Sequence, residues 1–363
     1  MLEELEALLI LNSLPLIGSI KIRLLIQQFG SSIDALKAPL NDIAILPGFG
    51  PKILDAWKQG LKEEKWLEDL SLIKKFGVTV IPYFSPQYPK KLLEIVDFPL
   101  ILYVQGKLLR QDERSLAVVG TRQATIYGQE MSKQFSKGLA QAGFTIVSGL
   151  ARGIDTLAHQ GALEAGRTIA VLGSGLASIY PSENKNLAAQ IAECGAVISE
   201  FPMATSPDRS HFPQRNRIVS GMTLGTILIE APEKSGAMLT AEKAMTQGRP
   251  VFALPGRADS DYFRGNHSLI KSKKAELVEN IQDILHYFNP TSLPFTVKTS
   301  ATQKIPLEKE EELLLSQFPT EELPLEEMIS RFQWPVAKLN VLLMSLVLKK
   351  MIKEYPGKIY KKI

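Results

Sequence analysis

Cysteine and histidine are scarce in this sequence of 363 residues, which contains one cysteine, Cys194, and four histidines. A single cysteine excludes a disulfide within the chain and a zinc site built from several cysteines, and it is typical of proteins from a reducing compartment. We expect Cys194 to pack in the interior as a small hydrophobic side chain. We expect no metal and no other cofactor.

Long apolar runs are also missing. No uninterrupted apolar stretch approaches the roughly 18 residues that a membrane-spanning helix requires. Residues 1–6 are acidic, whereas the start of a secretory signal peptide is basic. We therefore expect a cytoplasmic protein without a membrane span.

The sequence has little charge bias, with 42 Lys and Arg against 38 Asp and Glu and a net charge of +4. A small positive excess is compatible with a nucleic-acid partner, but a solvated charged surface gives the same values. Composition alone does not separate these two interpretations.

Three common catalytic or nucleotide-binding motifs are absent. The pair Gly173-x-Gly175 lacks the third glycine of a dinucleotide fingerprint, and the chain has no P-loop motif. The same segment lacks the Gly-x-Ser-x-Gly pattern of a nucleophilic serine. The sequence therefore gives no support for NAD binding, P-loop hydrolysis or acyl transfer, and we expect no enzyme activity.

Short apolar runs alternate with helical patterns through the middle of the chain. Six such runs begin at Leu116, Phe144, Thr168, Ala196, Thr226 and Pro250. Strands that alternate with helices predict an α/β fold with a doubly wound, mostly parallel sheet, which is an extended Rossmann-like fold. β-branched and aromatic runs between residues 76 and 106 predict two extra strands.

Changes in composition divide the chain into four segments. They are a small helical domain of the SAM or helix-hairpin-helix kind over residues 1–70, an extended Rossmann-like domain over 71–287, a linker rich in Pro, Ser and Thr over 288–307, and a winged-helix-like domain over 308–363.

The helical segment contains a short internal duplication, because residues 14–22 and 46–54 share a proline and a glycine in register. The second copy resembles a helix-hairpin-helix element, in which glycines and a helix N-terminus approach phosphate. A plain turn between two helices explains the same glycines. Both interpretations are open.

The C-terminal segment predicts three helices followed by a β-hairpin, which is the order of a winged helix. The third helix, over residues 335–351, is mainly apolar, with Lys338, Asn340 and Ser345 as polar positions in its middle. Reading of the major groove generally uses more Arg, Asn and Gln than this. We therefore favour a protein contact or weak DNA binding for this helix.

The residues that follow the predicted strands are glycines, hydroxyl residues, arginines and aromatics. Ligands of an open parallel sheet bind beyond the carboxyl ends of its strands. Backbone amides at glycine turns bind phosphate oxygens, arginine adds charge, and rings such as Phe212 and Tyr180 stack on bases. The predicted site consists of Gly120, Thr121, Arg122, Thr125, Ser148, Gly149, Arg152, Gly173, Gly175, Lys185, Arg209, Phe212, Arg215, Asn216 and Arg217. Such a crevice suits several phosphates rather than one.

Asp155 and His159 lie four residues apart, which on a helix makes them candidate metal ligands or an acid-base pair. A structural role explains them as well, with Asp155 as the N-cap residue of the helix and His159 packed beside it. The structural role is favoured, because no third ligand lies nearby in the sequence.

The motifs at the strand ends, taken in order, resemble the DNA-processing protein A (DprA/Smf) family. The match includes Val119-Gly-Thr-Arg122, Ser148-Gly-Leu-Ala-Arg-Gly-Ile-Asp155, Phe212-Pro-Gln-Arg-Asn-Arg-Ile218 and Leu254-Pro-Gly256, and it spans residues 76 to 285. The resemblance implies a homodimer that binds and protects single-stranded DNA and loads RecA recombinase during natural transformation, without catalysis.

Carried over by position, the resemblance also assigns roles to individual residues. The main strand contacts become Arg122, Lys185, Arg209, Phe212 and Arg215, and the pocket lining becomes Gly120, Ser148, Gly149, Gly173 and Asn216. Arg217 and Asp155 have a second possible role, which is to brace the loops as a buried Arg–Asp pair.

The sequence departs from the family pattern in three places. Thr121 replaces a serine and keeps the hydroxyl, and Ala177 stands where an aspartate is common. Ser272-Lys-Lys replaces an acidic residue and a glycine, which leaves the geometry of that loop open and predicts a longer basic path for DNA.

Two other functions fit parts of the sequence. A related Rossmann-like family cleaves nucleoside monophosphates with a Pro-Gly-Gly-x-Gly-Thr turn and a catalytic glutamate. Residues 231–236 read Ala-Pro-Glu-Lys-Ser-Gly here, so that pattern is missing, although Glu200 and Glu230 remain near the crevice. A winged-helix regulator that senses a phosphorylated ligand would explain the tail and the crevice together, but the apolar third helix argues against it.

Overall fold

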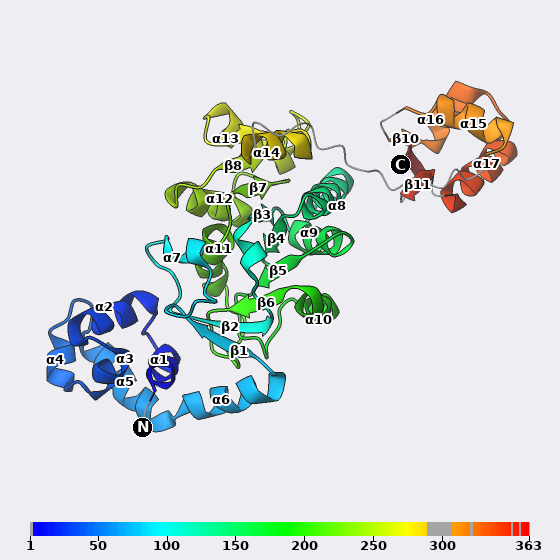
Figure 1. Cartoon of the computed structure of the whole chain (residues 1–363). Coiled ribbons are helices and arrows are strands. Elements are labelled where there is room, and N and C mark those ends of the chain that lie inside the picture. The colour runs from blue at the N-terminus through cyan, green and yellow to red at the C-terminus, as the bar shows by residue number, and fades with distance from the viewer. Residues whose placement is uncertain (1–2, 289–306, 320–321, 350, 356, 363) are drawn as a thin grey trace. The chain divides into compact units, whose positions relative to one another are not determined.

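The computed structural model describes residues 3–288, 307–319, 322–349, 351–355 and 357–362 (Figure 1). The chain forms two compact units, Met1–Phe295 and Thr296–Ile363. Only the two ends of the predicted linker, residues 288 and 307, fall within the described residues. The predicted domain boundaries therefore stay predictions.

The first unit begins with a group of helices. They are α1 (Glu4–Ser13), α2 (Ser19–Phe29), α3 (Ser32–Lys37), α4 (Leu40–Ala44), α5 (Pro51–Glu63) and α6 (Lys65–Phe76). The two duplicated segments have the same local structure, because Gly18 and Gly50 are the N-cap residues of α2 and α5. In each copy the residue two positions earlier is left-handed, with φ of 65° at Leu16 and 81° at Gly48. The helix-hairpin-helix interpretation itself stays a prediction.

A nine-stranded sheet forms the centre of the first unit, in the order β1-β2-β6-β5-β4-β3-β7-β8-β9. Its strands are β1 (Thr79–Pro82), β2 (Ile101–Gly106), β3 (Ser115–Val119), β4 (Thr145–Ser148), β5 (Thr168–Val171), β6 (Ala196–Ser199), β7 (Thr226–Leu228), β8 (Val251–Ala253) and β9 (Glu276–Leu277). Strands β3 to β9 run parallel, whereas β2 pairs antiparallel with β6 and β1 with β2. The prediction of a mostly parallel sheet with two extra strands is confirmed. Strand β9 was missed because it has two residues and both are exposed.

Helices cover both faces of this sheet, as the term doubly wound requires. They are α7 (Lys90–Leu93), α8 (Ile126–Gln141), α9 (Ile154–Leu163), α10 (Lys185–Cys194), α11 (His211–Gly221), α12 (Gly236–Thr246), α13 (Arg264–Lys271) and α14 (Ile281–Phe288). Successive strand residues point to opposite faces. Leu116 and Val118 of β3 therefore share a core with α8, α9 and α14, whereas Ala117 and Val119 share one with α11, α12 and α13.

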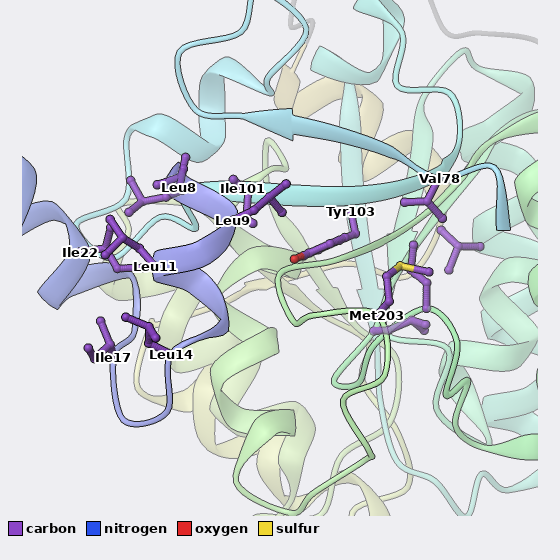
Figure 2. Close-up of a cluster of buried hydrophobic side chains, with 14 of the residues drawn as sticks. Leu8, Leu9, Leu11, Leu14, Ile17, Ile22, Val78, Ile101, Tyr103 and Met203 are labelled. Atoms are coloured by element: carbon purple, nitrogen blue, oxygen red, sulfur yellow. The ribbon is translucent and has the colours of Figure 1, made fainter. Parts of the chain in front are cut away.

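The N-terminal helices pack directly on the sheet. Leu8 and Leu11 of α1 belong to the same buried cluster as Ile101 and Tyr103 of β2 (Figure 2). Asp69 of α6 fixes this junction, since its carboxylate accepts hydrogen bonds from the Tyr103 hydroxyl at 2.6 Å and from the amide of Met203 at 2.5 Å. The helices and the sheet therefore share one continuous core.

The second unit contains α15 (Lys309–Ser316), β10 (Leu323–Pro324), α16 (Leu325–Phe332), α17 (Val336–Leu348), β11 (Ile352–Tyr355) and β12 (Ile359–Lys362). Its strands form a small sheet in the order β10-β12-β11. One face of α17 is buried through Leu339, Leu342, Leu343 and Leu346. The predicted helices and hairpin are present, with Pro356 of the turn outside the described residues, and the winged-helix assignment stays a prediction.

One expectation about the interior is wrong. Cys194 is exposed rather than buried. It is the last residue of α10, beyond the turns that bury Leu187 and Ile191 against the sheet. In the part of the chain that the structure describes, we find no helix with both the length and the apolar character needed to cross a membrane.

Candidate nucleic-acid interface

An open cleft of about 740 Å³ lies at the carboxyl ends of β3, β4 and β7, between α11 and α12. It lies where the strand-end rule predicts a ligand site. Eight residues of the predicted site line it: Gly120, Thr121, Arg122, Gly149, Arg209, Phe212, Arg215 and Asn216. The fold therefore brings loops that are distant in sequence to one surface.

Cationic and aromatic side chains meet on this surface. The guanidinium of Arg122 lies 5.3 Å from the centre of the Phe212 ring. The Phe212 and Tyr180 rings are 5.8 Å apart, and Tyr180 is 39% exposed. Arg209 is also exposed at the rim. The cleft thus offers positive charge next to rings on which bases could stack.

Arg152 lies in a smaller pocket beside the cleft, together with Tyr180 and Pro181. It forms an ion pair with Glu183, and both side chains are about half exposed. Because a neighbouring carboxylate offsets its charge, Arg152 contributes less positive potential than Arg122.

Arg215 forms the floor of the cleft and is 4% exposed. Its guanidinium donates to the carbonyl oxygens of Gly149 and Val171, at the ends of β4 and β5. Burial lowers the pKa of Arg215 to about 10, and the carboxylate of Asp155 opposes that shift. A side chain at position 149 would overlap this guanidinium, since its Cβ would lie 2.2 Å from a terminal nitrogen. Arg215 is therefore placed to hold the loops beneath the surface, and a strand contact by it stays a prediction.

Arg217 and Asp155 are both buried and brace loops, but they do so with different partners. Arg217 pairs with Glu200 and lies 3.5 Å from Asp97, outside the cleft lining. Asp155 accepts hydrogen bonds from the amides of Gly149 at 3.1 Å and Ala151 at 3.4 Å. Burial raises the pKa of both Glu200 and Asp155. The expected Arg217–Asp155 pair is wrong.

The N-cap prediction for Asp155 is also wrong, because the N-cap residue of α9 is Gly153. His159 is fully buried with its Nδ1 2.7 Å from the hydroxyl of Thr168. That hydroxyl donates its hydrogen to the carbonyl of Ile146 at 2.7 Å, so Nδ1 carries a proton and donates it to the hydroxyl. Burial lowers the pKa of His159 to about 3. Asp155 and His159 are therefore held by different protein groups. Backbone amides bind the carboxylate of Asp155, and the hydroxyl of Thr168 binds the ring of His159.

The other predicted residues do not line the cleft. The hydroxyl of Thr125 accepts from the amide of Gly128 at 3.1 Å and so caps α8. Ser148 donates to the carbonyl of Val118 at 2.7 Å. Gly173 lies against the Phe212 ring, Gly175 lies against the backbone of residues 202 and 203, and Lys185 is exposed at the start of α10. These residues shape the loops around the cleft, and DNA contact by each of them stays a prediction.

Several lining residues were not included in the predicted set. They follow β7, the strand beside β3, and include Lys234, Ser235, Gly236, Leu239 and Thr240. Ser235 caps α12 by accepting from the amide of Met238 at 3.4 Å. Their position just after a strand is the same signal that identified the rest of the site.

The comparisons with known proteins agree with this geometry. The family model for DNA recombination-mediator protein A matches residues 79–289. The chain is 40% identical to Protein Smf of Escherichia coli over 286 residues, which are 77% of this chain and 76% of that protein. The structure of DNA processing protein A from Streptococcus pneumoniae matches 78% of this chain and 97% of that one, at 35% identity and a TM-score of 0.66.

A second solved structure shows the single-stranded DNA binding mode of DNA processing protein A from Helicobacter pylori. It matches 59% of this chain and 96% of that one, at 30% identity and a TM-score of 0.54. The matching family model covers more than half of the sequence, including every residue that lines the cleft. The chain therefore belongs to the DNA recombination-mediator protein A family, the DprA/Smf family.

Proposed function

We propose that the cleft binds single-stranded DNA. The observation that carries this proposal is the exposed pair Arg122 and Arg209 beside the ring pair Phe212 and Tyr180, in one open cleft. Phosphates take the cations, and bases stack on the rings. Stacking needs unpaired bases, so a single strand fits this surface better than a duplex.

Membership of the family supports a proposal for the wider role. The Helicobacter pylori relative binds single-stranded DNA, which supports the same ligand here. We propose that the protein acts in the cytoplasm as a homodimer, protects single strands and loads RecA recombinase in transformation or recombination. RecA loading is tested by measuring RecA filament formation on a protein-coated single strand, with the cleft variant described below as the control.

We also propose that the protein works without catalysis. The two glutamates considered as catalytic groups are not placed to act on a ligand, since Glu230 is fully buried and Glu200 is paired with Arg217. Neither of them lines the cleft. Nucleotide hydrolysis therefore lacks an accessible carboxylate among the described lining residues other than Asp155, which is held by backbone amides.

The test is a fluorescence-anisotropy titration with a labelled single strand and the matching duplex, over a series of salt concentrations. We expect Arg122→Ala/Arg209→Ala to weaken single-strand binding at least tenfold. If each arginine contacts one phosphate, the slope of log affinity against log salt should fall by about 1.4. A matched control is Arg257→Ala/Arg264→Ala, which removes two exposed arginines outside the cleft.

The control variant should bind as the wild type does. Equal binding of single strand and duplex, or a cleft variant that binds normally, would contradict the proposal and move the DNA site elsewhere on the chain.

A further inference from the structure

The N-terminus of α8 lies at the point where the strand order of the sheet reverses. Helix α8 follows β3, and β3 lies between β4 and β7. In doubly wound sheets a nucleotide phosphate binds at such a point, on the free amides that begin the helix. In this protein the carboxylate of Glu230, a residue that comes just after β7, lies beside the start of α8.

Glu230 is fully buried, and its carboxylate is hydrogen-bonded at the start of α8. One oxygen accepts from the amide of Thr125 at 3.3 Å. The other accepts from the same amide and from the Thr125 hydroxyl, both at 3.1 Å. The hydrogen bonds found for this carboxylate in the described residues all come from the residue that caps α8.

The carboxylate also packs tightly against the first turn of α8. A Cβ at Gly128 would lie 1.8 Å from the second carboxylate oxygen. The lack of a side chain at this helical glycine therefore leaves the space that the carboxylate occupies. Burial raises the pKa of Glu230, and hydrogen bonding from Thr125 opposes that shift.

We propose that Glu230 is a specificity-determining residue that occupies the nucleotide-phosphate position at α8 and thereby excludes mononucleotides and dinucleotides. A ligand phosphate would have to displace a carboxylate that is already buried and hydrogen-bonded. The neighbouring cleft, between α11 and α12, is then the surface left for a polynucleotide. This last step rests on the proposed single-strand binding, whereas the exclusion of nucleotides does not.

The test compares wild type, Glu230→Gln and Glu230→Ala by thermal melting in inorganic phosphate or adenosine monophosphate, against chloride at equal ionic strength. Gln keeps the shape of the side chain, whereas Ala opens the space. Of these three proteins, we expect only Glu230→Ala to show a higher melting temperature, by about 5–10 °C, when phosphate is near 100 times its dissociation constant. Glu230→Ser is the second opened variant, in case Ala lowers the yield of folded protein.

Single-strand binding is measured on the same samples, so the two proposals fail separately. If the opened variants fold and phosphate does not raise their melting temperature, the proposal about Glu230 is wrong. It is also wrong if wild type is stabilised by adenosine monophosphate as much as the opened variants are. If the wild type does not bind single-stranded DNA, the proposed function is wrong, and the role of Glu230 is unaffected.

Discussion

At the scale of single residues, two of the arginines that line the cleft, Arg122 and Arg215, differ in burial and therefore in role. Arg122 is exposed, whereas Arg215 supports the carbonyls of Gly149 and Val171 and lies near Asp155. Removing Arg215 takes a hydrogen-bond donor from each of these carbonyls and removes the positive charge that opposes the buried carboxylate of Asp155. We expect Arg215→Ala to lower the free energy of unfolding by about 3–5 kcal/mol, measured by urea titration.

The matched comparison is Arg122→Ala, which should change the free energy of unfolding by less than about 0.5 kcal/mol because the side chain is exposed. If Arg215→Ala is as stable as Arg122→Ala, the supporting role assigned to Arg215 is wrong.

His159 gives the protein a defined response to acid. Its pKa is about 3 in the folded state, below the ordinary value of 6.5. Between these two pH values the unfolded chain binds a proton that the folded chain does not bind. This contribution to stability is complete above pH 6.5 and is lost as the pH falls from 6.5 toward 3. We expect a loss of about 2 kcal/mol between pH 7.5 and pH 5, from urea titrations at each pH.

The control for this prediction is His159→Gln, which cannot titrate in that range. Its stability should change less between the same two pH values, and an equal change in both proteins would assign the acid response to other groups.

Residue-scale geometry also shows what the sequence could reveal about α11. Phe212, Arg215 and Asn216 line the cleft, and their spacing places them on one helical face. Arg217 is the next residue of the helix, so it lies on a different face, and its guanidinium pairs with Glu200 instead. That separation was predictable from the helical period. The burial of Arg215 was not, because it depends on carbonyls from β4 and β5, whose positions only the folded sheet determines.

At the scale of elements, the duplicated turns before α2 and α5 place different residues in one conformation. Leu16 and Gly48 both have positive φ, which costs a leucine about 1–2 kcal/mol and costs glycine little. Leu16 is 52% exposed, so few contacts are lost with its side chain. We expect Leu16→Gly to raise the free energy of unfolding by about 0.5 kcal/mol and Gly48→Ala to lower it by about 1 kcal/mol, both measured by urea titration.

Opposite signs for the two variants are the distinguishing result. If Leu16→Gly is destabilising, the exposed leucine contributes more by contact than it costs in backbone strain.

The elements themselves were predictable to different degrees. Strands β3 to β8 are apolar runs buried on both faces, a pattern that sequence alone reveals. Strand β9 is short and exposed, and only its pairing with β8 defines it. The apolar character of α17 is explained in part by its buried face, but Val341, Met344 and Leu348 are 69%, 68% and 75% exposed. These three side chains lie three and four residues apart, on a different helical face from the core leucines, and the helical period separates the two sets.

At the scale of the whole molecule, the chain folds as two units with separate cores. The N-terminal helices share a core with the sheet, whereas the C-terminal cluster contains residues of the second unit alone. We expect calorimetry to show two unfolding transitions. A variant that ends at residue 295 should lose one transition and keep the other at the same temperature, and a shift of the remaining transition would show that the units stabilise each other.

The open form of the cleft has one more consequence. Its lining comes from the loops after β3, β4 and β7 and from α11 and α12, and it includes exposed side chains, so a strand can enter from the side. A site of this kind imposes no topological condition on its ligand, because nothing has to be threaded through it. A closed circle of single-stranded DNA should therefore bind with the same affinity per site as a linear strand, and the protein could act in the middle of a long molecule without ever meeting an end.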